Sequence, residues 1–233
     1  MLKRFANRGF VESFNSLPTA ATAVAKSGHL DELIVLEQIG ARRSFAREAE
    51  IYAEGDHPDC WFRVISGTVR LCKLLADGRR NIAEFLHSGE FFGLDDGDER
   101  FCSAEAVDDI IIMRFPKSAT ERLIAKRPEL AMRLCNLTLR NLSRAQERMM
   151  LLGCMSAAER IASFLLELTE RRDLGRFLDL PMTRRDIGDY LGLTTETVSR
   201  TLTAFKRDGV IAIPSMHRIE IRDREALEAL AEA

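Results

Sequence analysis

Residues 183–200 read TRRDIGDYLGLTTETVSR, and the spacing of these residue types predicts a helix, a tight turn and a second helix. Thr183 and Thr194 stand where the helices need N-caps, because a threonine hydroxyl accepts a hydrogen bond from an otherwise unpaired backbone N–H. Gly192 permits a left-handed turn, and Gly188 lets the second helix approach closely. The predicted shared core of the pair consists of Ile187, Leu191, Leu193, Val198 and Leu202. A generic helical hairpin with solvated charges does not need all these spacings at once, so we interpret the segment as a helix-turn-helix.

The second helix is expected to begin at Thr195, to continue to about Asp208 and to stop at Gly209. The residues predicted to read bases from its outward N-terminal face are Thr195, Glu196, Ser199 and Arg200. In the major groove a carboxylate accepts from cytosine, an arginine fork fits guanine, and a hydroxyl or methyl group meets thymine. Basic residues near the same element are predicted to contact DNA phosphates, namely Arg184, Arg185, Lys206 and Arg207.

The flanking segments complete a predicted winged DNA-binding domain over residues 156–233. Ser156 is placed to cap an amphipathic helix that continues through Glu170. The tail predicts a strand over 210–213, a turn over 214–216 and a second strand over 217–221. These two strands would form the wing.

Upstream, the stretch from Glu129 to Met155 predicts one long helix, because it holds a single late glycine, Gly153, and no proline. Apolar and small residues recur along it at alternating steps of three and four, the spacing of a two-stranded coiled coil. The predicted seam consists of Cys135, Thr138, Leu142, Ala145, Met149 and Leu152. The alternative is that this stripe packs on its own domain. We favour a homodimer seam, since one small domain cannot cover so long a helix.

Before the helix, residues 36–116 have the texture of short strands separated by glycine turns. Asp77-Gly78 lies between two apolar segments, which is a strong hairpin signal. We therefore predict an antiparallel β-roll over 36–116, followed by a dimerisation helix region over 117–155. Residues 1–35 show no firm pattern and are interpreted as an N-terminal extension. The expected fold class is α+β.

The bulk composition excludes several classes of protein. The formal net charge of −2 gives no general argument for a nucleic-acid partner, so any basic surface must be local. No apolar run approaches the roughly 18 residues of a membrane span, and the chain's start lacks the apolar stretch of a signal peptide. Five separated cysteines, Cys60, Cys72, Cys102, Cys135 and Cys154, are typical of thiols in a reducing compartment. We expect a cytoplasmic protein with no membrane partner.

The order of roll, long helix, helix-turn-helix and wing resembles the CRP/FNR family over nearly the whole chain. The segment from Glu196 to Arg200 matches that family's Glu-x-x-Ser-Arg reading motif. The cyclic-AMP branch typically carries Arg and Gly where this chain has Thr195 and Ser199, so the chain resembles the FNR/FixK branch. The resemblance implies a cyclic-nucleotide-binding-like roll and a homodimer that binds TTGAT-N4-ATCAA-like palindromes. It also implies an activator that works with RNA polymerase on genes of low-oxygen respiration or nitrogen fixation.

Similar proteins use several effectors, and each effector needs residues that can be sought here. A cyclic-nucleotide cassette needs a carboxylate and a hydroxyl where this chain has Leu94 and Phe101, so only Arg100 remains to meet a phosphate. An iron–sulfur cluster of the FNR type needs closely spaced N-terminal thiols, and no cysteine precedes Cys60. The position of that cluster's fourth ligand is filled by Ile112. We expect regulation without cyclic AMP, an iron–sulfur cluster or another cofactor.

Three alternatives remain open at this point. A single histidine could bind haem iron, which leaves a haem- or nitric-oxide-responsive regulator of the same family as the second hypothesis. Direct oxidation of a thiol such as Cys154 is another possible input. The rival class is a cupin-type metalloenzyme, but the strand region holds only His57 and His87, and we predict neither a metal site nor an enzyme.

Overall fold

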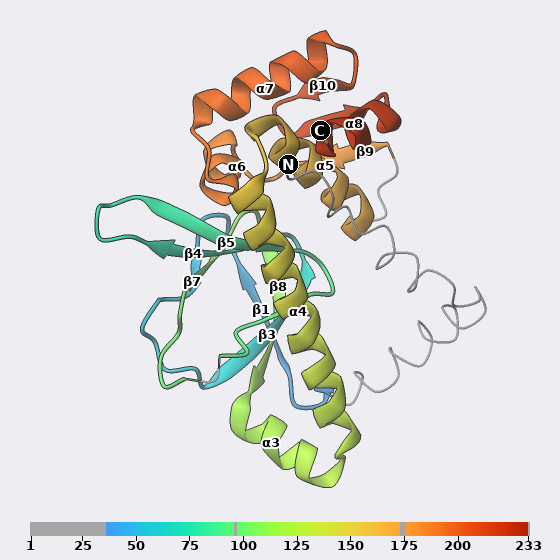
Figure 1. Ribbon diagram of the computed structural model, residues 1–233. Coiled ribbons are helices and arrows are strands. Elements are labelled where there is room, and N and C mark those ends of the chain that lie inside the picture. Colours follow the sequence, from blue (N-terminus) through green and yellow to red (C-terminus); the bar gives the residue numbers. More distant parts are fainter. Residues whose placement is uncertain (1–35, 96, 173–175, 233) are drawn as a thin grey trace, which may run out of the picture.

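The computed structural model describes residues 36–95, 97–172 and 176–232, and the predicted extension over 1–35 lies outside them. Figure 1 shows a β-roll, a long helix that runs along the roll, and a small helical domain with a sheet at the end of that helix. The fold is the predicted α+β arrangement of roll, long helix and winged helix-turn-helix. None of the described helices combines the length and apolarity needed to cross a membrane.

The roll consists of two four-stranded antiparallel sheets with strand orders β1-β8-β3-β6 and β2-β7-β4-β5. Alternate strand residues point inward, and Val64, Val69 and Ile112 are fully buried between the sheets. The Asp77-Gly78 turn joins β4 to β5 as predicted, with Gly78 at φ 81°. The strands are β1 (Ala41–Phe45), β2 (Glu50–Tyr52), β3 (Cys60–Ser66), β4 (Val69–Leu74), β5 (Arg80–Leu86), β6 (Phe91–Phe92), β7 (Ser103–Ala106) and β8 (Ile110–Pro116).

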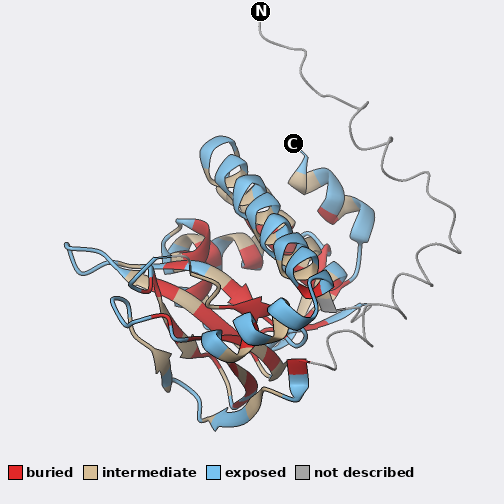
Figure 2. Cartoon of the chain, turned by 90° about the horizontal axis from the view of Figure 1, so that it is seen from below, coloured by how far each residue is buried: buried red, intermediate tan, exposed pale blue. Residues whose placement is uncertain are grey.

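After the roll, a short helix α3 (Lys117–Lys126) leads into α4 (Glu129–Cys154), which has 26 residues and closely matches the predicted long helix. The inner face of α4 packs on the roll through Leu134 and Leu137. Its other side is exposed, and Figure 2 shows that side in pale blue. One small roll therefore covers only one face of the helix.

The described residues of the C-terminal domain pack four helices and a three-stranded sheet around one core. Its elements are α5 (Ala157–Arg172), β9 (Phe177–Asp179), α6 (Arg184–Leu191), α7 (Thr195–Arg207), β10 (Ile211–Ser215), β11 (Arg218–Ile221) and a further helix α8 (Arg224–Ala231). The wing turn falls at Met216 and His217 rather than over 214–216. Pro214 is tolerated in β10 because β10 is an edge strand and its pairing with β11 is irregular between Ala212 and Ser215.

The helix-turn-helix forms through the predicted caps and glycines. Thr183 and Asp186 make a reciprocal capping box at the start of α6, and Gly192 ends that helix at φ 65°. Thr194 caps α7 by accepting a hydrogen bond from the backbone N–H of Thr197 at 3.2 Å. A Cβ added at Gly188 would lie 2.6 Å from the carbonyl oxygen of Leu193, so the turn needs glycine there.

We predict that Gly188→Ala lowers the free energy of unfolding by about 1–3 kcal/mol, because the clash is with rigid backbone rather than with a movable side chain. Chemical denaturation would measure the change. Gly97→Ala is the matched control, because its Cβ would meet nothing closer than the Glu99 carbonyl oxygen at 3.7 Å. Equal stability changes in the two variants would contradict the close approach.

Candidate nucleic-acid interface

The exposed face of α7 carries all four residues predicted to read bases. Val198, Leu202 and Phe205 are buried against the domain core, which turns the opposite side of the helix to solvent. That side presents Thr195, Glu196, Ser199 and Arg200, all of them exposed. Thr203 lines the same surface one turn after Ser199, and the prediction had missed it. The spacing of four residues from Ser199 could have indicated in the sequence that Thr203 lies on the same face of the helix.

The predicted phosphate-binding residues differ in how free their charges are. Arg185 and Lys206 are exposed near the two ends of the helical pair. Arg207 donates from Nε to Oδ1 of Asp208 at 2.9 Å, so a neighbouring carboxylate already offsets its charge. Arg184 is half-buried, and this burial lowers the pKa of its guanidinium. Arg185 and Lys206 are therefore the better placed pair for phosphate.

The wing adds a second projecting element to this end of the molecule. Met216 at its tip is 81% exposed. His217 is held at the base of the turn, where its Nδ1 lies 3.0 Å from the carbonyl oxygen of Leu180. The Arg218 guanidinium lies over the ring of Phe177, 4.7 Å from its centroid. The wing turn is thus fixed on the sheet while its tip remains exposed.

In the roll, the arginine that might have met a nucleotide phosphate is already used by the protein. Arg100 is 2% exposed, donates to Oδ2 of Asp95 and to the Gly93 carbonyl, each at 2.7 Å, and also reaches the Cys60 carbonyl. Its guanidinium stacks on the ring of Tyr52, 4.3 Å from the centroid. A phosphate here would have to compete with the Asp95 carboxylate, so Arg100 is a poor anion site.

Thiols and metal-binding side chains offer little reactive chemistry in the roll. Cys60, Cys72 and Cys102 are buried, and burial raises the pKa of each thiol, that of Cys72 to about 12. Cys135 and Cys154 are exposed on α4. Within the described residues, no group of three His, Cys, Asp or Glu side chains is arranged to hold a metal ion.

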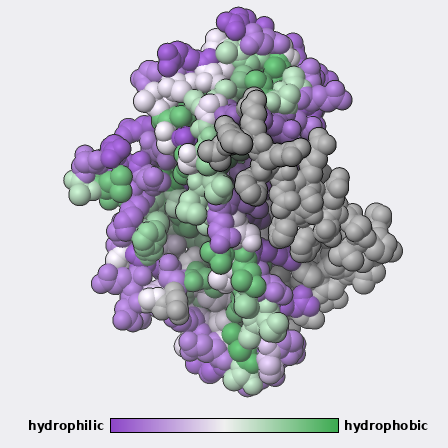
Figure 3. Space-filling model, viewed as in Figure 1, coloured by the Kyte–Doolittle hydropathy of each residue, from purple (hydrophilic) through white to green (hydrophobic). Residues whose placement is uncertain are grey.

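The outward side of α4 carries apolar side chains that no described residue covers. Figure 3 shows apolar side chains gathered along the course of this helix. We call its exposed apolar residues the outer stripe: Met132, Cys135, Leu139, Leu142, Met149 and Met150. Of the six predicted seam residues, Leu152 is half-buried in its own chain and the other five are exposed. The outer stripe shares Cys135, Leu142 and Met149 with the predicted seam and adds Met132, Leu139 and Met150.

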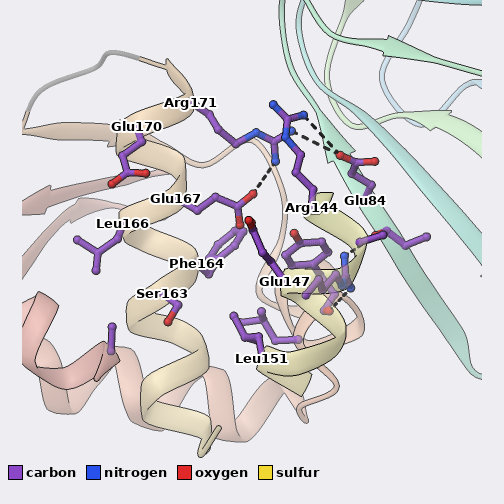
Figure 4. Close-up of a pocket in the computed structure, with 16 residues that line it drawn as sticks. Glu84, Arg144, Glu147, Leu151, Ser163, Phe164, Leu166, Glu167, Glu170 and Arg171 are labelled. Carbon is purple, nitrogen blue, oxygen red and sulfur yellow. Dashed lines mark hydrogen bonds and ion pairs between the residues drawn. The ribbon is translucent and has the colours of Figure 1, made fainter. Parts of the chain in front are cut away.

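A cleft of about 480 Å³ separates the roll from the C-terminal domain, between β5, α4 and α5 (Figure 4). Charged side chains cross it: Arg171 of α5 and Arg144 of α4 reach Glu90 of the roll at 2.6 and 2.8 Å. Burial would raise the pKa of Glu90, but the charges of Arg171 and Arg144 and the hydrogen bonds that the carboxylate accepts together lower it. Glu84, further from both arginines, has its pKa raised by burial. The cleft is thus bridged by ion pairs between the domains.

Comparison with known proteins places both halves of the chain. Residues 42–127 match the cyclic nucleotide-binding domain family, and residues 159–230 match the Crp-like helix-turn-helix domain family. The nitrogen fixation regulation protein FixK of Azorhizobium caulinodans is 42% identical over 84% of this chain and 81% of its own. FixK of Bradyrhizobium diazoefficiens is 41% identical over 91% of each chain.

Solved structures agree with these sequence matches. The structure of FixK2 from Bradyrhizobium japonicum superposes with a TM-score of 0.80 at 38% identity, covering 84% of this chain and 98% of that one. The similar proteins are transcription regulators rather than enzymes, which sets aside the cupin hypothesis.

Proposed function

The chain belongs to the CRP/FNR family of transcription regulators, and we propose that it binds TTGAT-N4-ATCAA-like palindromes as a homodimer without a bound effector. The observation that carries the proposal is the exposed face of α7, where Glu196, Ser199 and Arg200 project from a helix capped and packed on its other side. In keeping with the FixK relatives, it would activate genes of low-oxygen respiration or nitrogen fixation. It would do so in the cytoplasm, by recruiting RNA polymerase.

The outer stripe of α4 supports the homodimer. Leu142 and Met149 are 53% and 67% exposed, and an apolar row of this length on one helix face favours burial against a second copy. We keep the domain boundaries predicted from the sequence: a roll over 36–116, a dimerisation region over 117–155 and a DNA-binding domain over 156–233. The predicted seam and the outer stripe share Cys135, Leu142 and Met149, which we propose as the centre of the interface.

Independence from an effector is supported by the roll. Because Arg100 is neutralised by Asp95 and stacked on Tyr52, the roll supplies packing rather than a charged ligand site. The test is a binding titration of purified protein on the palindrome at several salt concentrations, with no ligand added. Affinity equal to that for scrambled DNA would reject the proposal.

We predict different effects from three substitutions on α7. Arg200→Ala and Glu196→Ala should each cost about 1–3 kcal/mol of binding free energy and relax discrimination at one base pair. Lys206→Ala should weaken all sequences about equally and reduce the salt dependence by about one counterion per half-site. Titrations on matched and singly mutated palindromes would measure both effects.

The matched control for Lys206→Ala is Lys126→Ala, which removes the same charge from α3, at the far end of the molecule from α7 (Figure 1). It should leave the affinity and the salt dependence unchanged. A uniform loss of affinity in Arg200→Ala, together with altered base preference in Lys206→Ala, would show that α7 is docked differently.

For the dimer, we predict that Leu142→Glu converts the protein to a monomer, because the interface would have to bury an unpaired charge. Sedimentation at micromolar concentration would show the change. Arg140→Glu adds the same side chain on the exposed side of α4 away from Leu142, because two residues of helix turn by about 200°, and it should remain dimeric. A monomeric wild-type protein would refute the interface.

For the roll, we predict no binding heat with cyclic AMP and no change in DNA affinity when cyclic AMP is added. Isothermal calorimetry checks the first, and the palindrome titration checks the second. A cyclic-AMP-dependent regulator of the same family serves as the positive control. Saturable micromolar binding coupled to tighter DNA binding would overturn the proposed independence.

A further inference from the structure

The first helix of the helix-turn-helix is held to the roll by a compact charged contact, which we call the latch and define as Arg70, Arg80, Asp186 and Asp189. Arg80 of β5 donates from Nε to Oδ2 of Asp189 at 2.9 Å, and its Nη2 donates to Oδ1 of Asp186. Arg70 of β4 reaches the same Asp186 oxygen from Nη1 at 3.3 Å. Two neighbouring strands of the roll thus contact one turn of α6.

Asp186 has two roles at once. Its Oδ2 accepts from the backbone N–H of Thr183 at 2.9 Å and from the Thr183 hydroxyl at 2.7 Å, which completes the cap of α6. Its Oδ1 is left for the two arginines. The residue is 2% exposed, and burial alone would raise its pKa, but the Thr183 hydrogen bonds and the two arginine charges lower it. The carboxylate is therefore charged and fixed in one orientation.

The arginine side of the latch is equally constrained. Arg70 is 4% exposed and donates from Nε to Glu105 at 2.7 Å and from Nη2 to Glu48 at 2.6 Å. These two carboxylates belong to the roll, and they fix the orientation of the guanidinium that contacts Asp186. A planar guanidinium bound on several sides allows little rotation, so the contact specifies an orientation as well as a distance.

Apolar contacts beside the latch keep the domains together without it. The Tyr190 ring packs against Phe85 of β5 and Phe164 of α5, with centroids 5.0 and 5.5 Å away. Arg148 of α4 stacks on the same ring at 3.6 Å. Such contacts are less directional than the charged ones, so loss of the latch should permit sliding or rotation of α6 rather than unfolding.

We propose that the latch positions the recognition helices for one particular distance between half-sites, so that Arg80 is a positioning residue for spacing and not for base identity. This inference rests on the proposed binding of a palindrome by a homodimer. A dimeric helix-turn-helix protein places its two recognition helices about one DNA turn apart, which makes half-site spacing a geometric property of the protein. The latch joins α6, and with it α7, to the roll on which α4 is packed.

Different residues would control the preference for half-site spacing and the discrimination between bases. Glu196 and Arg200 lie on the exposed face of α7, whereas the latch lies on α6 against the roll. Loosening the latch would leave each recognition helix intact but broaden its orientation relative to α4. A dimer whose recognition helices sample more orientations binds its best site more weakly, because only some of these orientations fit that site. The same dimer binds half-sites at other spacings with a smaller loss of affinity.

The experiment measures the affinity of full-length protein for the palindrome and for the same half-sites with the spacer lengthened by two base pairs. That insertion rotates one half-site by about 70°, since a turn holds 10–10.5 base pairs. Wild type should lose about tenfold or more in affinity on the longer spacer, and Arg80→Ala should lose less than about threefold. Discrimination against a mutated half-site base should be the same in both proteins.

Arg79→Ala is the matched control, because Arg79 adjoins Arg80 but is exposed and paired with Asp77 of its own hairpin. It should keep the wild-type spacing preference. Arg80→Lys retains the charge without the fork and should fall between wild type and Arg80→Ala. Equal spacing preference in wild type and Arg80→Ala would overturn the inference, as would a wild type that binds both spacers equally.

A second measurement needs no DNA and separates this inference from the proposed function. Hydrogen exchange should be about fivefold faster in Arg80→Ala than in Arg79→Ala at residues 82–86 and 187–191, where β5 and α6 cover each other. Exchange over β3 and β8 should not change. If wild type bound no palindrome, the proposed function would fail, and the exchange rates would still decide the latch. Unchanged exchange at the β5–α6 contact would reject it.

Discussion

The contact of the Asp186 carboxylate with the guanidinium groups of Arg70 and Arg80 joins the two halves of this molecule. One of its oxygens caps α6 and the other meets the roll, so the start of the helix-turn-helix and its attachment to the roll depend on the same buried group. A buried carboxylate is tolerated only where its charge is met on every side. Because α7 packs on α6, the direction of the recognition helix depends on this attachment.

The long helix α4 serves two domains with different faces. Its inner face covers the roll through leucines, and Arg148 near its end reaches β5 carbonyls and the ring of Tyr190. No described residue covers its outer stripe, as the proposed dimer requires. The roll packs against α4 and contacts α6, and its buried Arg100 is paired internally with Asp95. This arrangement agrees with a regulator that binds DNA without a small ligand.

Local features of the chain were predictable, whereas contacts between distant segments were not. The caps at Thr183 and Thr194, the left-handed Gly192 and the Asp77-Gly78 hairpin all follow from interactions within a few residues. The short strand β9 was missed, because three residues of strand carry little periodic signal and tertiary packing decides their state. The helix α8 was also missed, although Asp223 at its N-cap and the apolar Leu227 were available signals. The exposure of individual residues of α4 also needed the tertiary structure, since Leu152 has the apolar character of a seam residue but is half-buried in its own chain.

By itself, the sequence determined the order of roll, long helix and winged helix-turn-helix, and it identified the outward residues of α7, because helix periodicity and capping are local properties. Only the tertiary structure showed that Arg100 is buried, paired with Asp95 and stacked on Tyr52. It also brought Arg70 and Arg80 to Asp186, more than a hundred residues along the chain. The physical reason is that an arginine's partner depends on which strands and helices pack together, and no spacing within the sequence encodes that choice.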